Sequence, residues 1–133
     1  MSQQVKLADF ENAAAFGEIR DDRVTPYICP PEVAAAIRTG NTGHLVVSGA
    51  EDVWAVGIMA LRLFGLRDPF SAVSGLEPST SALTAISQLS QSDIETVLRG
   101  AGVVQDSELE SFLIGSRGSP GCLAVMADSR ATV

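Results

Sequence analysis

The stretch that decides the fold reads Glu51-Asp52-Val53-Trp54-Ala55-Val56-Gly57-Ile58-Met59-Ala60-Leu61-Arg62-Leu63-Phe64-Gly65. At about 3.6 residues per turn, its apolar side chains cover every face of a helix, and Arg62 is its only charge after Asp52. A helix that is apolar all round belongs inside a protein core. We therefore predict a buried central helix over about residues 50–65, with other elements packed around it.

Signals at both ends support this helix. Ser48 lies three residues before Glu51, which is the pattern of a capping box at a helix start, and Gly65 is a typical helix stop. A helix of this length is too short for a bilayer, which needs roughly 20 apolar residues. The pattern indicates a buried helix of a soluble protein.

Composition limits the classes of function. A chain of 133 residues fits one domain, and a hydrophobic fraction of 46% excludes a disordered chain. The net charge of −7 opposes nonspecific binding to nucleic acids and to anionic membranes. We expect a protein substrate or protein partner, with no nucleic acid and no membrane.

Cysteine and histidine are scarce. Cys29, Cys122 and His44 are the only residues of these types, too few for a disulfide framework or a zinc site. The N-terminus lacks an apolar signal core, and no run reaches transmembrane length. We expect reduced thiols and a cytoplasmic protein.

The chain before the central helix is predicted to be mostly irregular. Residues 5–10 alternate apolar and polar side chains, which favours a short N-terminal strand, and residues 11–24 form a loop with at most one helical turn. Pro26, Pro30 and Pro31 favour extended backbone in the residues before them. Pro31 can then be the first residue of a short helix over residues 32–38, which the turn residues 40–43 end.

Amphipathic helices are predicted after a loop over residues 66–79. The first covers about residues 80–89, the second begins at Ser92, and the third begins at Ser107. Glu95 and Glu110 stand three residues after these serines, as capping boxes require. The composition changes at residue 117, so residues 117–133 are interpreted as a divergent tail.

Three separated stretches resemble the C-terminal lobe of a eukaryotic protein kinase. Residues 5–11 resemble the strand and Asp-Phe-Gly turn, and residues 25–33 resemble the end of the activation segment with its Ala-Pro-Glu motif. Residues 52–58, followed by Leu-Phe-Gly at 63–65 and Pro-Phe at 69–70, resemble the central helix with its Asp-Val-Trp-Ser-Leu-Gly motif. The Thr-Pro-Tyr sequence at 25–27 favours the serine/threonine branch.

This resemblance implies a mainly α, kinase C-lobe-like helical subdomain with a short N-terminal strand. Residues 1–116 would form a partial kinase domain, with the activation segment over residues 9–32 and the later helices over about residues 80–115. The parent activity would be ATP-dependent phosphorylation of serine or threonine in proteins.

The resemblance assigns roles around the Asp-Phe turn. Asp9 would hold magnesium beside the ATP phosphates, or it is an ordinary exposed loop acid. Phe10 would be the packing residue of the turn, and a core phenylalanine is equally consistent. Glu11 departs from the motif, because glycine there allows the backbone to turn freely and Glu adds a negative charge.

Further roles follow along the activation segment. Thr25 and Tyr27 would line the substrate site, although Thr25 also fits an ordinary turn before proline and Tyr27 an ordinary packing residue. Pro31 and Glu32 belong to the Ala-Pro-Glu motif, and Glu32 would form a buried ion pair with an arginine. The Asp-Pro-x-x-Arg sequence that normally supplies that arginine does not occur here.

Residues of the central helix have structural roles in the resemblance. Asp52 would bind the backbone of the catalytic loop, or it acts only as a first-turn acid on the helix dipole. Trp54 and Gly57 belong to the same motif and are candidate structural residues.

No catalytic residue can be assigned. The sequence contains no glycine-rich phosphate loop, no strand lysine before residue 5 and no His-Arg-Asp loop, all of which phosphoryl transfer on this fold requires. Magnesium and ATP belong to the parent fold, and we expect this chain to bind neither.

Three hypotheses remain open from the sequence. The first is an inactive fragment of a kinase domain, and the second is a pseudokinase-like module that binds a protein partner. The third is an unrelated small helical domain.

Overall fold

The computed structural model describes residues 6–19, 24–65, 82–100, 107–116 and 119–125. Within these ranges most of the regular structure is helical, so the prediction of a mainly α protein is confirmed. Short 3-10 helices lie in the N-terminal part of the chain: η1 (Phe10–Asn12), η2 (Pro26–Ile28) and η3 (Thr42–His44). None of the described helices is long and apolar enough to cross a bilayer.

Helix α1 (Pro31–Thr39) begins and ends where the sequence predicts. Pro31 is its first residue, and the preceding Pro30 is extended. Gly40 ends the helix with a φ of 70°, a left-handed conformation that glycine adopts without strain. The amides of Gly40 and Asn41 donate to carbonyls of the last turn, at 3.1 Å to Ile37 O and 2.9 Å to Ala36 O.

Helix α2 (Gly49–Leu63) is the predicted central helix. One face is buried and carries Val53, Trp54, Gly57, Ile58 and Leu61. The prediction of burial on every face is wrong, because the opposite face is open to solvent. The predicted capping role of the Ser48 side chain is also wrong, since this side chain makes no cap hydrogen bond.

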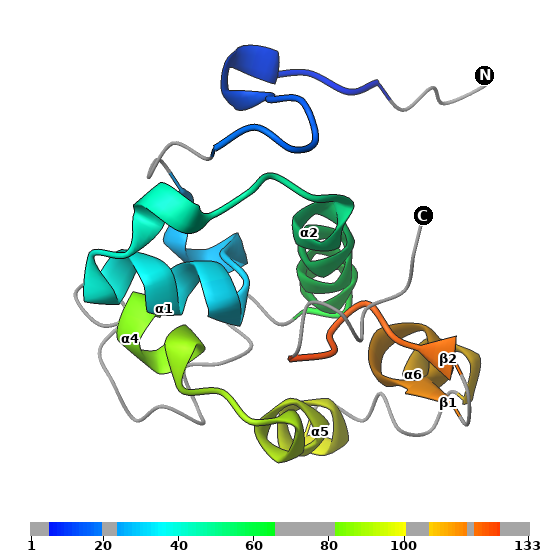
Figure 1. Cartoon of the computed structure of the whole chain (residues 1–133). Helices are drawn as coiled ribbons and strands as arrows, with labels where there is room; N and C mark the ends of the chain where they lie inside the picture. The colour runs from blue at the N-terminus through cyan, green and yellow to red at the C-terminus, as the bar shows by residue number, and fades with distance from the viewer. Residues whose placement is uncertain (1–5, 20–23, 66–81, 101–106, 117–118, 126–133) are drawn as a thin grey trace.

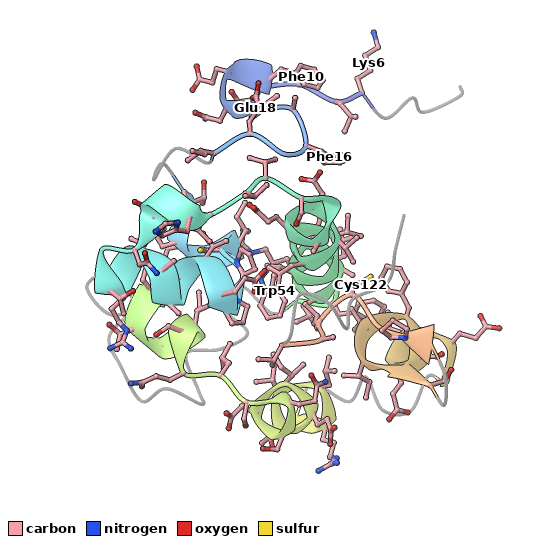
Figure 2. The ribbon with its side chains drawn as sticks, in the orientation of Figure 1. Lys6, Phe10, Phe16, Glu18, Trp54 and Cys122 are labelled. Carbon is pink, nitrogen blue, oxygen red and sulfur yellow. The ribbon has the colours of Figure 1, made fainter. Side chains whose placement is uncertain are left out.

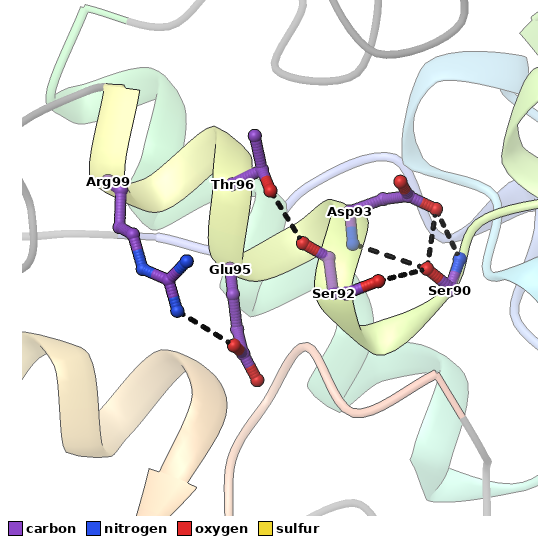
Figure 3. A network of polar contacts seen from close by, with 6 residues as sticks. All are labelled: Ser90, Ser92, Asp93, Glu95, Thr96 and Arg99. Atoms are coloured by element: carbon purple, nitrogen blue, oxygen red, sulfur yellow. Dashed lines mark hydrogen bonds and ion pairs between the residues drawn. The ribbon is translucent and has the colours of Figure 1, made fainter.

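Two short helices follow, α4 (Ala82–Ser87) and α5 (Gln91–Gly100). The predicted capping box of α5 is displaced by two residues (Figure 3). The Asp93 amide donates to Ser90 Oγ at 3.3 Å, and the Ser90 amide donates to Asp93 Oδ2 at 2.8 Å. Glu95, the expected partner of Ser92, instead pairs with Arg99 at 3.1 Å.

Helix α6 (Ser107–Ile114) leads directly into a small antiparallel pair, β1 (Gly115–Ser116) and β2 (Ser119–Pro120). The start at Ser107 agrees with the sequence prediction, whereas the capping role of its side chain lies outside the described residues. The chain then crosses back over the helices through residues 121–125.

The core joins the α-helices that the structure describes (Figure 1), with α1 packed against α4 and α5 against α6. Its fully buried large side chains are Val33, Trp54, Ile58, Leu61, Ile94, Leu98, Leu113 and Leu123.

The predicted N-terminal strand is wrong. Residues 6–9 have no regular structure and are exposed, and Asp9 has a φ of 68° and ψ of 56°, which interrupts an extended backbone. A strand also needs a pairing partner, and the bridge that does form lies farther along, between Ile19 and Val46.

Residues 121–125 pack into the same core as the helices, although the sequence places them in a divergent tail. The Leu123 amide donates to Leu113 O at 2.8 Å, and the Cys122 amide donates to Phe112 O at 3.0 Å. Gln91 Oε1 accepts from the Val125 amide at 3.2 Å. Residues 121–125 therefore belong to the same core as the helices, and the division of the chain at residue 117 stays a prediction.

Candidate functional site

Residues 25–32 close the predicted activation segment and run directly into helix α1. Thr25 is exposed and precedes η2, in which the Ile28 amide donates to Thr25 O at 3.1 Å and the Cys29 amide to Pro26 O at 3.3 Å. The prolines restrict the backbone on both sides of this turn. The prolines and the hydrogen bonds of η2 therefore restrict the backbone of this segment even without tertiary packing.

Packing fixes the segment further. Cys29 is 2% exposed, and Pro30 and Pro31 are buried beside it. Helix η2 contacts both α2 and α4, and the half-buried Ile28 packs against the core cluster. Tyr27 is half-buried. The segment is therefore anchored in the core, while Thr25 at its start is exposed to solvent.

Asp9, Phe10 and Glu11 lie on a different part of the molecule. All are exposed, Phe10 with 65% of its surface. The hydrogen bonds of the N-terminal segment run to the loop before α2: the Gly17 amide donates to Val47 O at 3.0 Å, and the Val47 amide donates to Glu18 O at 2.9 Å. Figure 2 shows Phe10 and Phe16 on this segment, outside the group of helices.

The acids of the two longer motifs both occupy first helical turns. Glu32 is half-buried in the first turn of α1, and Asp52 is exposed in the first turn of α2. A carboxylate at this position is favoured by the helix dipole and by unpaired backbone amides. Both acids therefore stabilise their own helices, whatever further role they have. The arginine partner implied for Glu32 stays a prediction.

Gly57 and Trp54 lie on the buried face of α2. Trp54 is fully buried, and Gly57 faces Leu123 and Cys122 of the crossing segment. Sequence analysis missed Leu123 and Cys122 as partners of this helix. An isolated glycine inside an otherwise apolar helix was the available signal, because such a glycine often marks a close packing contact.

Two titratable groups among the described residues have shifted pKa values. Burial raises the pKa of the Cys122 thiol, and hydrogen bonds from the Ser90 hydroxyl and amide lower the pKa of Asp93. Within the described ranges, no three His, Cys, Asp or Glu side chains gather in a way that could hold a metal ion.

Known proteins resemble part of this chain. The serine/threonine-protein kinase TAO3 of Gallus gallus is 31% identical over 94 residues, which is 71% of this chain and 9% of that kinase. Human mitogen-activated protein kinase kinase kinase kinase 3 is 41% identical over 69 residues, which is 49% of this chain and 7% of that kinase. Part of this chain is related to serine/threonine protein kinases.

The similarity covers only part of this chain and only a small part of each relative. The chain spans less than a tenth of the length of these relatives, as their shares of 9% and 7% show. No family model matches the chain, and no solved structure matches it.

Proposed function

We propose that this chain is a fragment of a protein serine/threonine kinase domain, taken from the C-terminal lobe and beginning just before the Asp-Phe turn at Asp9. The parent activity is ATP-dependent phosphorylation of serine or threonine in proteins. The observation that supports this proposal is the identity of 31% with TAO3 over 94 residues. The mainly helical fold is consistent with it.

The geometry of residues 25–34 supports a role in holding a polypeptide. A substrate-binding surface needs a rigid base and accessible polar groups. The buried Cys29, Pro30 and Pro31 supply the base, and the exposed Thr25 supplies a hydroxyl. In the parent domain this segment would face the protein substrate.

The chain is proposed to be inactive by itself and to bind neither magnesium nor ATP. Magnesium in kinases is held by several oxygens in a near-octahedral arrangement beside the phosphates. The described residues do not fit this site, since Asp9 is exposed on a segment whose hydrogen bonds run to residue 47. Glu11 adds a second negative charge where the family has glycine. No candidate base is assigned.

Radiolabelled ATP and a generic protein substrate test this proposal directly. We expect no transfer of label and no shift of the melting temperature with magnesium and ATP. The Asp9→Asn variant is the control for a contaminating kinase, because label that persists in this variant does not come from the chain. Transfer that requires Asp9 would contradict the proposed inactivity.

A chimera tests the kinase origin. The segment of TAO3 from its Asp-Phe-Gly turn to the end of its kinase domain is replaced by residues 9–116 of this chain, once unchanged and once with Glu11→Gly. If the chain is a kinase fragment, the Glu11→Gly chimera phosphorylates its substrate and the unchanged chimera is much weaker. A folded Glu11→Gly chimera that neither binds ATP nor transfers label would speak against the proposed origin.

A second candidate is a protein-binding module without catalysis. The observation that favours it is the exposed apolar face of α2, where Met59 is 58% and Leu63 83% exposed. Capture of a stable partner, together with the absence of an ATP-induced thermal shift, would support this candidate. Loss of capture in Met59→Lys would locate the partner on α2.

A further inference from the structure

Residues 6–19 lie outside the core. Every one of these residues is exposed, and none of them belongs to the buried cluster that joins the helices. Even the large apolar side chains of the segment, Leu7, Phe10, Phe16 and Ile19, are 65% to 83% exposed. Detachment of the segment would therefore expose little apolar surface that is now buried, so it costs far less than unfolding of the helices.

A tight turn over residues 15–18 folds this segment back on itself. The Glu18 amide donates to Ala15 O at 3.2 Å, and the Ala15 amide donates to Glu18 Oε2 at 3.1 Å. Gly17 stands at the third position of the turn with a φ of 91°, where a type II turn requires a positive φ that glycine adopts without strain.

The turn is fastened to the chain just before α2 by backbone groups. The Gly17 amide donates to Val47 O at 3.0 Å, and the Val47 amide donates to Glu18 O at 2.9 Å. The bridge between Ile19 and Val46 lies next to these bonds. Because one side of this fastening is the turn itself, the hydrogen bonds depend on the backbone conformation of Gly17.

Phe16 adds a side-chain contact at the same place. Its Cζ lies 3.6 Å from the position that a Cβ on Gly49 would occupy, at the first residue of α2. Figure 2 shows Phe16 near this end of the helix. We call residues 6–19 the strap, and we call its contacts with residues 46–49 the latch.

We propose that the strap opens and closes at the latch while the helices stay folded. A closed latch ties the segment that carries Asp9 to residues 46–49, and an open latch releases that segment. Any role of Asp9 rests on the proposed kinase origin, whereas the opening of the strap does not depend on it.

Hydrogen exchange of the full chain, followed by NMR at single amides, tests the opening. The Gly17 and Val47 amides report on the latch, and the Leu123 amide, which donates to Leu113 O at 2.8 Å inside the core, reports on the helices. We expect the two latch amides to exchange at similar rates, each roughly tenfold or more faster than the Leu123 amide. Latch amides that exchange as slowly as Leu123 would overturn the proposal, because the strap would then open only with the whole fold.

Gly17→Ala tests the latch itself. Within the described part of the chain, its sequence neighbours aside, nothing lies within 4 Å of a Cβ on Gly17, so this substitution acts through the positive φ and not through a clash. We expect exchange of the Val47 amide to accelerate by roughly fivefold or more, while the Leu123 amide is unaffected.

Gly43→Ala is the matched control. Gly43 lies in η3, its φ is not positive, and a Cβ there also meets nothing described within 4 Å. Exchange of the Val47 amide should therefore stay as in the wild type. An unchanged rate at Val47 in Gly17→Ala would show that the turn does not fasten the strap. Equal acceleration at Val47 and Leu123 would show that the strap is part of the global fold, and either result would overturn the proposal.

Discussion

Gly57 shows how one missing side chain sets the packing of two segments. A Cβ at this position would lie 2.5 Å from Leu123 Cδ2 and 3.1 Å from Cys122 Cβ. We expect Gly57→Ala to lower the free energy of unfolding by roughly 1–3 kcal/mol through overpacking, although alanine is the better helix former. Urea unfolding followed by circular dichroism measures this change.

Gly100 provides the matched control for this substitution. It is the last residue of α5, and nothing lies within 4 Å of a Cβ built there. We expect Gly100→Ala to leave the unfolding midpoint unchanged or slightly higher. Equal losses of stability at both positions would show that crowding by Leu123 is not the cause.

Ser90, not Ser92, caps helix α5. Its Oγ accepts from the Asp93 amide at 3.3 Å. We expect Ser90→Ala to cost about 1 kcal/mol of unfolding free energy, as is typical when a capping hydroxyl is lost. Ser92 is the serine that the sequence predicts as the cap, and Ser92→Ala should lower the unfolding free energy clearly less than Ser90→Ala does. A larger loss of thermal stability in Ser92→Ala than in Ser90→Ala would instead support the predicted capping box at Ser92.

The same cap makes stability depend on pH. The Ser90 hydroxyl and amide lower the pKa of Asp93 from its ordinary value of 3.8. The unfolded chain therefore binds this proton more tightly, so the contribution of Asp93 is present above about pH 4 and is lost as pH falls further. The unfolding midpoint of Asp93→Asn should fall less steeply below about pH 4 than that of the wild type. Parallel curves for the two proteins would contradict this assignment.

Cys122 should be chemically inert in the folded chain. It is 5% exposed, and burial raises the pKa of its thiol, so the reactive thiolate is scarce. Cys29 is 2% exposed. We expect both thiols to react slowly with an aromatic disulfide reagent under native conditions and rapidly in urea. A fast native reaction that is lost in Cys122→Ser would contradict the burial of this segment.

At the scale of elements, the sequence predicts helices better than it predicts which faces are covered. Apolar content identifies α2, and Pro31 and Gly40 identify the ends of α1. Burial is different, because a face is buried only where another element packs on it. Nothing in the order of residues 50–65 distinguishes the covered Ile58 from the exposed Met59.

The crossing segment is the element that sequence patterns could not find. Residues 121–125 have no helical or strand period, and they are held by backbone hydrogen bonds such as that from the Leu123 amide to Leu113 O. Periodicity detects regular elements, and an irregular segment gives no such signal. Its position follows from the space that Gly57 leaves on α2.

Leu123→Ala measures what this segment contributes. The side chain is fully buried in the core cluster, so its truncation should lower the free energy of unfolding by about 2–5 kcal/mol. Leu63→Ala is the matched control, because Leu63 is 83% exposed and its truncation should change stability by less than about 0.5 kcal/mol. Similar losses for both would mean that the segment is not part of the core.

At the scale of the molecule, the sequence locates the candidate motifs along the chain, and their chemistry stays a prediction. The motifs at residues 25–33 and 52–58 fall on η2, α1 and α2, which contact one another through η2 and α2. The Asp9 segment has no strand to hold it, so it lies with residues 46–49. The roles of Asp9, Glu32 and Asp52 stay predictions.

One continuous core implies one unfolding transition. The buried cluster includes residues of α1, α2, α4, α5, α6 and the crossing segment, so these described elements share one core. Trp54 is the only tryptophan and is fully buried, so its fluorescence reports on this core alone. We expect fluorescence and circular dichroism to give the same midpoint in urea, as two-state unfolding requires. A fluorescence transition that precedes the loss of helix would instead mean that α2 separates from the other helices before they unfold, and that Leu123 does not hold them together.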